Sequence, residues 1–430
     1  MISKLIKKNK TFFLLIIWLS FFLSINLNPQ EFFQLNLINK FRLILPFLLS
    51  LILILFSLNK IETSKQFQLP HVFFYLIFFS YLCFNLINDL NSNYNLFWPI
   101  IMFLSYFVLQ SFVKKNERIL ILKFTILILV FVFLFFLSSG LIKLILSDKY
   151  HLYGIGLAYS GGIEHPPRSS GLARLSLIIY GFLIIYYLCK NNIKNYKFLF
   201  LILFFAVFTL LFQSRTTSFI FILINLIFFV FYTKRFFFDK RLIFFSIILP
   251  FFINLSYTIS IIPVSKKTSE VKVSKIFELS KNSLIRKQSN IEEVDKYSSG
   301  RFGNWSKAVK IIKKKPLNGY GAQADRIYIK QSIHNSLLYS SLSGGLIASV
   351  CIVIIYFYSV WFIYKIYFVN HKKFINNVEI NFCILLIIIL NLRSILETSF
   401  AIFSIDFLIY ILAFSILNDH LIKNKNEKVI

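Results

Sequence analysis

The chain has 430 residues, of which 57% are hydrophobic and 19% aromatic, while 15% are charged. Soluble globular domains carry about 25% charged residues, so this composition excludes an ordinary soluble protein. The formal net charge of +29 does not indicate nucleic acid, because the basic residues stand in short clusters beside apolar runs, as in the cytoplasmic loops of membrane proteins.

Twelve apolar segments, each about long enough for a membrane-spanning helix, follow one another along the chain. They are 11–28, 41–58, 71–88, 96–113, 120–142, 172–189, 198–213, 216–233, 242–262, 336–364, 378–396 and 399–417. The first follows a lysine cluster but lacks a small-residue cleavage site, so we interpret it as an uncleaved helix. The fold class is therefore an all-α polytopic membrane protein with about 12 transmembrane helices and one large loop that contains short helices.

The distribution of basic residues predicts the orientation. With a cytoplasmic N-terminus, the inner connections and tails, together with adjoining helix ends, hold 23 Lys and Arg residues. The short outer connections hold 8, and the loop 263–332 holds the other 16 of the 47. Cytoplasmic loops retain Lys and Arg, whereas long loops are largely exempt from this bias. We therefore expect both termini in the cytoplasm and the segment 143–171 outside.

The long loop contains one clear helical pattern. Trp305, Ala308, Val309 and Ile312 fall at i, i+3, i+4 and i+7, which is one face of a helix that Pro316 ends. The lysines between them lie largely off this face. We expect a short amphipathic helix on the outer leaflet, with a helix in a soluble lid as the alternative.

Two arginines at the outer side are candidate phosphate ligands. Arg215 lies in a turn of about three residues between two apolar segments, and Arg301 follows Gly300 and precedes Gly303. Planar guanidinium groups suit phosphate oxygens. The alternatives are an interfacial arginine that extends to water and an ordinary surface arginine.

The glycine-rich segment 154–171 reads as a flap that leads into a helix. Arg168, within the flap, and Arg174, just after it, are candidates for a second phosphate or sugar contact. Positioning of a helix end is an equally good interpretation of both.

His334 stands beside Asn335 where the long loop meets the next apolar segment. Imidazole titrates near neutrality and suits a general base, although a lone histidine is more often structural. Arg393 and Glu397 are four residues apart, which favours a structural ion pair on one helix face; ordering of the site is the alternative.

Motifs for cofactor chemistry are absent from the sequence. It contains no P-loop, no Rossmann glycine signature, no HExxH and no Asp-x-Asp. We therefore expect a reaction that needs neither nucleotide nor metal, and no cofactor.

Several short segments occur together in order. They are Pro167-Arg168-Ser169-Ser170-Gly171, Ser214-Arg215, Gly300-Arg301 through Trp305, Pro316-Leu317-Asn318-Gly319-Tyr320-Gly321, His334-Asn335 with Gly344-Gly345, and the Arg393/Glu397 helix. With the helix layout, this order resembles the O-antigen ligase and O-antigen polymerase superfamily of bacterial envelope glycosyltransferases. The resemblance covers about residues 150–410.

The resemblance implies transfer of a glycan from undecaprenyl pyrophosphate to the hydroxyl of an acceptor glycan or lipid A core. Arg215 and Arg301 would neutralise the pyrophosphate, and His334 would deprotonate or orient the hydroxyl. Further substrate contacts would come from Arg168, Arg174, Tyr320, Asn335, Arg393 and Glu397. A chain-length regulator is a further expected partner, besides the lipid bilayer. Since no convincing carboxylate nucleophile lies near His334, single displacement with inversion is expected.

The resemblance places the protein in the bacterial inner membrane. Residues 1–262 would hold nine helices and the outer flap 143–171, residues 263–335 a large periplasmic loop, and residues 336–430 three helices and a cytoplasmic tail. A protein O-oligosaccharyltransferase is a variant of the same activity, and a polymerase is slightly favoured over a ligase. A lipid-linked oligosaccharide transporter, or flippase, is the alternative from another class.

Overall fold

A computed structural model describes most of the chain. The described residues are 10–26, 36–57, 69–88, 93–146, 150–153, 156–159, 169–190, 196–212, 214–231, 248–249, 252, 301–369, 377–402 and 404–426. The predicted span 242–262 and most of the long loop, including Gly300, therefore lie outside the described residues apart from positions 248, 249 and 252.

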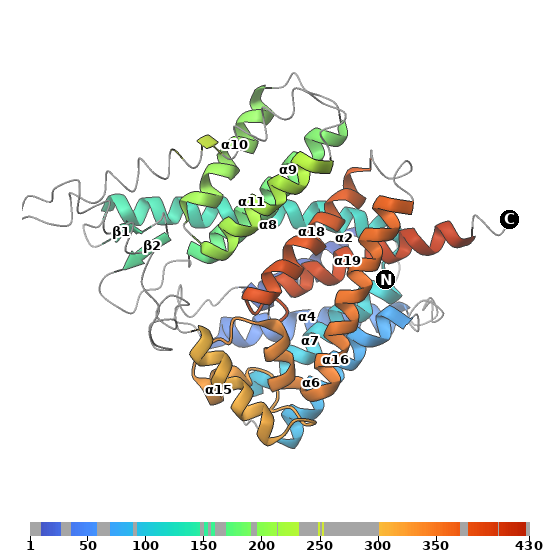
Figure 1. Ribbon diagram of the computed structural model, residues 1–430. Helices are drawn as coiled ribbons and strands as arrows, with labels where there is room; N and C mark the ends of the chain where they lie inside the picture. Colours follow the sequence, from blue (N-terminus) through green and yellow to red (C-terminus); the bar gives the residue numbers. More distant parts are fainter. Residues whose placement is uncertain are drawn as a thin grey trace, which may run out of the picture.

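Helices occupy each of the other predicted spans (Figure 1). They are α2 Lys10–Asn26, α4 Asn36–Ser57, α6 Leu69–Ile87, α7 Asn93–Ser111, α8 Lys115–Leu146, α9 Ser169–Lys190, α10 Tyr196–Leu211, α11 Arg215–Phe231, α16 Ser336–Tyr364, α18 Val378–Leu396 and α19 Ile405–Asn426. The last helix begins six residues later than predicted, because the chain after Thr398 first forms turns closed by Ala401 and Ser404.

The described helices make the protein a multi-pass membrane protein. Five segments are long and apolar enough to cross a bilayer: Leu69–Ile87, Lys115–Ser138, Gly171–Cys189, Ser336–Val369 and Val378–Leu396. Shorter apolar helices lie at Lys10–Ser24, Ile44–Leu55, Leu96–Ser111, Lys197–Leu211 and Arg215–Phe228. These findings confirm the coarse fold class of the sequence prediction, while the number of spans stays a prediction.

The bundle is held by close packing and by hydrogen bonds between helices. Lipid tails are as apolar as leucine, so association within a bilayer depends on shape and on polar contacts. The Trp18 indole donates to Thr125 at 2.9 Å, and the Tyr180 hydroxyl donates to Asn225 at 2.5 Å. The Phe74 ring lies 5.1 Å from that of Phe414. These contacts join helices that are far apart in the sequence.

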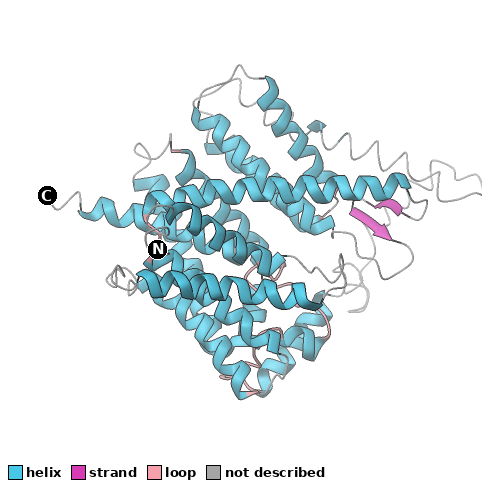
Figure 2. Cartoon of the chain, turned by 180° about the vertical axis from the view of Figure 1, so that it is seen from behind, coloured by secondary structure: helices cyan, strands magenta, loops and turns pink. Residues whose placement is uncertain are grey.

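A small hairpin departs from the all-α expectation. Strands β1 Tyr150–Tyr153 and β2 Gly156–Tyr159 pair antiparallel. Figure 2 places them at one end of α8. They lie in the predicted outer flap 143–171, of which residues 147–149, 154–155 and 160–168, including Arg168, lie outside the described residues.

The long helix α16 is broken at Gly345, where φ is 63° and ψ is −160°. The break frees backbone groups that the segment 317–321 satisfies. Tyr320 N–H donates to Leu342 O at 2.7 Å, and Gly321 N–H donates to Ser343 O at 2.8 Å. In return, Leu346 N–H donates to Leu317 O at 3.2 Å. The Pro-Leu-Asn-Gly-Tyr-Gly motif therefore docks on a discontinuity in a membrane helix, where unpaired backbone groups would be costly.

The first turns of α16 belong to a second small core. Helix α15 Arg301–Lys314 and the π-helical turn η2 Asp325–Ile329 pack on them. The buried members of this core are Ala308, Tyr320, Ala324, Ile329, Ile333 and Leu342. Trp305 and Ile312 pack against it as predicted, whereas Val309 is 38% exposed, so the predicted apolar face is narrower than expected. This core positions the loop that carries His334.

Candidate functional site

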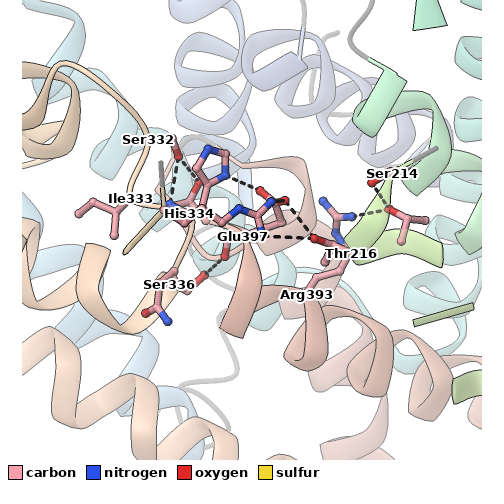
Figure 3. Close-up of polar contacts among 12 residues, drawn as sticks. Ser214, Thr216, Ser332, Ile333, His334, Ser336, Arg393 and Glu397 are labelled. Atoms are coloured by element: carbon pink, nitrogen blue, oxygen red, sulfur yellow. Dashed lines mark hydrogen bonds and ion pairs between the residues drawn. The ribbon is translucent and has the colours of Figure 1, made fainter. Parts of the chain in front are cut away.

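The side chain of His334 contacts the side chain of Glu397 (Figure 3). The imidazole Nδ1 lies 2.7 Å from Oε2 of the carboxylate. Because a carboxylate only accepts hydrogen bonds, Nδ1 carries the proton. In the neutral imidazole this leaves the lone pair on Nε2, which is the nitrogen that can take a proton from another group.

The backbone at His334 has an unusual conformation that directs this side chain. Its φ of 53° lies in the left-handed region, which few residues other than glycine adopt and which is often found at functional sites. The next residue, Asn335, caps α16 by accepting from Leu338 N–H at 2.8 Å. Its amide also donates to Ile395 O at 2.9 Å. Asn335 therefore fixes the start of α16 against the end of α18.

Ser336 makes a second connection between the same two helix ends. Its hydroxyl donates to Glu397 O at 3.1 Å and accepts from Phe400 N–H at 3.0 Å. A third contact joins the hydroxyls of Ser332 and Thr398 at 3.1 Å. The backbones that carry His334 and Glu397 are thus held together independently of their side chains.

Arg301 shares the carboxylate of Glu397. Its Nη2 lies 2.8 Å from Oε1, and its Nη1 lies 3.5 Å from the Thr216 hydroxyl. That hydroxyl in turn lies 3.4 Å from Oε1. Glu397 therefore receives hydrogen bonds from residues that lie 63 and 96 positions earlier in the sequence.

The charged residues around the Glu397 carboxylate form one layer. A second charged layer, around Asp406, lies beside it and is more deeply buried. Asp406 is 1% exposed and accepts from Arg393 Nε at 3.4 Å, while its other oxygen lies 3.1 Å from Arg174. Arg393 also donates to the Thr217 hydroxyl at 3.2 Å. The neighbouring threonines at the start of α11 thus join the two layers.

The ion pair predicted between Arg393 and Glu397 is not formed. Helix α18 ends at Leu396, and Glu397 adopts an extended backbone with φ −142° and ψ 160°. Helical spacing therefore no longer applies, and Arg393 pairs with Asp406 instead. The charges are paired as expected, but with other partners.

The remaining predicted residues lie in different places. Arg215 is the first residue of α11 and is exposed, on the same turn as Thr216 and Thr217. Tyr320 packs in the second core, where its hydroxyl donates to Ile311 O at 3.2 Å. Its described contacts are with that core rather than with Glu397.

The arginines and histidine make Glu397 a stronger acid. Burial alone would raise its pKa, but the hydrogen bond and charge of His334, with the charges of Arg393 and Arg301, hold the pKa of Glu397 below its ordinary value. The carboxylate is therefore ionised at neutral pH. His334 and Arg301 keep 35% and 26% of their side-chain surface exposed, so a ligand can reach both.

The sequence reasoning missed Asp406, Thr216 and Thr217. A signal for Asp406 was present, because it is the one charged residue in the predicted span 399–417 and intramembrane charges are usually paired and functional. The threonines had no comparable signal, since Thr residues at helix starts are common caps.

One part of the chain, which contains Arg215, Arg301 and His334, matches a known sequence family. Residues 198–353 match the family model described as O-antigen ligase. The chain carries an O-antigen ligase family domain. No curated protein matches the chain.

The O-antigen ligase domain covers α10, α11, α15 and the part of α16 up to residue 353, which lies beyond the break at Gly345. This family consists of glycosyltransferase-type enzymes of the bacterial envelope, which identifies the protein as an enzyme of that type. Glu397, Arg393 and Asp406 lie beyond the matched residues and are joined to the O-antigen ligase domain by the contacts above.

Proposed function

We propose that the protein transfers a glycan from undecaprenyl pyrophosphate to an acceptor hydroxyl at the periplasmic face of the bacterial inner membrane. The observation that carries the proposal is the shared carboxylate of Glu397, which holds the imidazole of His334 and the guanidinium of Arg301 at one point. An oriented base and a phosphate ligand are the two groups that such a transfer needs.

On the donor side, the bond between the anomeric carbon and the pyrophosphate oxygen breaks, and negative charge develops on the leaving pyrophosphate. The two layers pair Arg174, Arg301 and Arg393 with the carboxylates of Glu397 and Asp406. Arg215, at the exposed start of α11, would bring the excess of positive charge to two. This excess matches the two charges of a pyrophosphate diester. Loss of one such preorganised donor typically reduces the rate by about 10²–10³.

On the acceptor side, a hydroxyl is a weak nucleophile and needs a base. Nε2 of His334 would take the hydroxyl proton while Nδ1 donates to Glu397, and the oxygen would form its new bond to the anomeric carbon. The resulting imidazolium would be stabilised by the ionised Glu397, as in other acid–histidine pairs. A single displacement inverts the anomeric centre.

The ends of the helices support a site at the membrane surface. Helices α9, α11, α16 and α19 begin near it, and α18 ends near it, which agrees with the predicted alternation of spans. The proposed orientation makes this the periplasmic end, with both termini cytoplasmic. We favour a polymerase that extends an acceptor glycan over a ligase that uses lipid A core.

The transporter alternative has two observations in its favour. Helix α16 is broken, and Arg393 and Asp406 are buried charges. Transporters place such features near the bilayer midplane. Here the charges lie within the last turn of α18 and the first turn of α19, beside His334, which favours surface chemistry. The O-antigen ligase family match favours the same reading.

The test is product analysis in a host that supplies lipid-linked repeat units. His334→Ala, Arg215→Ala and Arg301→Ala are expected to insert normally and to accumulate untransferred units on the outer face. Arg326→Ala is the matched control, because the side chain of Arg326 is 42% exposed and pairs with the neighbouring Asp325 at 3.9 Å. Full activity in all three site variants would refute the site. Accumulation of units on the inner face would favour transport.

A further inference from the structure

Helix α15 turns a strongly basic face away from the protein. Its last three turns and the following residue carry Lys307, Lys310, Lys313, Lys314 and Lys315, all of which are exposed. Between positions 301 and 324 there is no acidic residue at all, and Asp325 is 1% exposed. The described part of the chain therefore offers this face no nearby carboxylate from its own helix or from the segment that follows.

Apolar side chains are exposed beside these lysines. Phe302 is 50% exposed, Val309 38% and Leu317 64%. The inner side of the helix, by contrast, is packed through Ala308 and Trp305 against the second core. A helix that buries one face in a protein core does not need apolar residues on its outer face. The three exposed apolar side chains are therefore typical of a helix whose outer face lies in an apolar or interfacial environment.

The position of α15 supplies that environment. It packs on the first turns of α16, a segment that is long enough to cross the bilayer, and it lies at an edge of the bundle in Figure 1. The neighbouring turns of α16 expose Leu337, and farther along Leu346 and Ile347. Exposed apolar side chains are therefore found both on α15 and on the helix against which it packs.

We propose that the outward face of α15 binds the anionic headgroups of phospholipids in the adjacent leaflet. Lysine ammonium groups would contact the headgroup phosphates, while Phe302, Val309 and Leu317 reach the acyl boundary. A hydrophilic anionic glycan would satisfy the lysines but would leave the apolar side chains in water. Phospholipids match both parts of this surface, because their phosphates suit the lysines and their acyl chains suit the apolar side chains.

The helix is connected to the site at several points. The Trp305 indole donates to Ile333 O at 2.6 Å, next to His334, and Asn304 donates to Gln331 at 2.9 Å. Arg301, the first residue of α15, contacts Glu397. Headgroup binding would therefore hold the segment that presents both Arg301 and His334. Lipid binding itself does not depend on the proposed transfer reaction.

The test places a polarity-sensitive fluorophore at position 306, which is exposed on α15. Ser306→Cys is labelled in a full-length background with Cys83→Ser and Cys189→Ser, since Cys351 and Cys383 are buried. The protein is reconstituted in phosphatidylcholine nanodiscs with or without phosphatidylglycerol. We expect a blue shift with phosphatidylglycerol that high salt reverses.

The double variant Lys310→Gln/Lys314→Gln should weaken this response by about fivefold per lysine. The matched control is Lys114→Gln/Lys197→Gln, which removes two exposed lysines elsewhere and should retain the full shift. Equal emission in the two kinds of nanodisc, or equal responses of the two double variants, would overturn the proposal. So would a shift that inorganic phosphate reproduces in phosphatidylcholine alone, because it would indicate a free-anion site. The readout is optical, so loss of transfer activity would count against the proposed function only.

Discussion

His334 Nδ1 and Glu397 Oε2 lie 2.7 Å apart although 63 residues separate them in the chain. The two residues come from opposite sides of one junction, where α16 begins and α18 has just ended. Three contacts made by neighbouring amide and hydroxyl side chains hold this junction without the side chain of either residue. Either side chain of the pair can therefore be substituted while the contacts that hold the two helix ends together remain.

Glu397→Gln is expected to reduce transfer by about 10²–10⁴ without loss of folded protein. An amide can either accept from or donate to Nδ1, so the imidazole is no longer held with its lone pair on Nε2. The measurement is glycan product per inserted protein in the lipid-linked repeat host, over a range of pH. Glu397→Asp, which keeps the charge, should recover part of the rate.

Glu379→Gln is the control for this substitution. Glu379 lies in the first turn of the same helix α18 and pairs with Lys123, whose side chain is 56% exposed. Its replacement should leave both the rate and the pH profile unchanged. Equal losses in the two variants would show that α18 tolerates no neutral replacement, and the orienting role of Glu397 would be withdrawn.

The lowered pKa of Glu397 predicts a pH dependence of stability. Its folded pKa lies below the ordinary 4.5, so it contributes stability at pH values above 4.5. That contribution is lost as pH falls below 4.5 and through the folded pKa. Thermal unfolding in detergent should show that the difference in Tm between wild type and Glu397→Gln shrinks as pH falls below 4.5. A difference that stays constant or grows would contradict the ion-pair assignment.

The helices could be predicted because apolar length and turn residues are local properties. The end of α15 before Pro316 and the capping of α16 by Asn335 follow from neighbouring residues. A break was predicted at Arg215, and it lies just before this residue, between Leu211 and Arg215. The gathering of arginines and His334 was predicted only by resemblance, and the structure brings Arg301, His334 and Glu397 together.

The ion-pair partners of Arg393 and Glu397 could not be predicted from the distance between these residues in the sequence. Glu397 leaves the helix one residue after α18 ends, so its direction depends on tertiary contacts with Arg301 and His334. The docking of Gly319 on the break at Gly345 joins segments whose pairing leaves no local pattern. Long-range backbone pairing of this kind is decided by which groups remain unsatisfied after the helices form.

Arg301 and His334 should be energetically coupled through Glu397. In a double-mutant cycle of Arg301→Ala and His334→Ala, we expect the losses in rate not to multiply, because both residues act through one carboxylate. The coupling should be about 0.5–3 kcal/mol, measured from kcat/KM of the reconstituted enzyme. Arg326→Ala combined with His334→Ala is the control cycle and should be additive. Additive losses for Arg301 would mean that the two residues work independently.

Asp406 should contribute strongly to the stability of the folded protein, because it pairs with the buried Arg393 in the second charged layer. Asp406→Ala leaves Arg393 buried and without its carboxylate, and breaking one partner of a buried pair typically destabilises by about 3–5 kcal/mol. The measurement is thermal unfolding of the purified protein. Glu117→Gln is the comparison, because its partner Lys10 is 33% exposed and such pairs are worth about 1 kcal/mol or less. A smaller loss for Asp406→Ala than for Glu117→Gln would contradict the buried pairing.

The broken helix makes a prediction that glycine substitutions can test. A Cβ at Gly345 would overlap Leu317 O, and its φ of 63° disfavours any side chain. A Cβ at Gly319 would overlap Ser343 O, from the other side of the same contact. Both Gly345→Ala and Gly319→Ala should therefore lower Tm and increase proteolysis of the segment 301–334.

Gly171→Ala is the matched control, because a Cβ there has no atom within 4 Å and the residue lies in α9. Alanine is the better helix former by up to about 1 kcal/mol, so this variant should be unchanged or slightly more stable. If Gly345→Ala and Gly319→Ala behave like Gly171→Ala, the Pro-Leu-Asn-Gly-Tyr-Gly segment does not dock on the break. Loss of stability in both, with α16 otherwise intact, would locate the connection between the loop and the membrane helix at these two glycines.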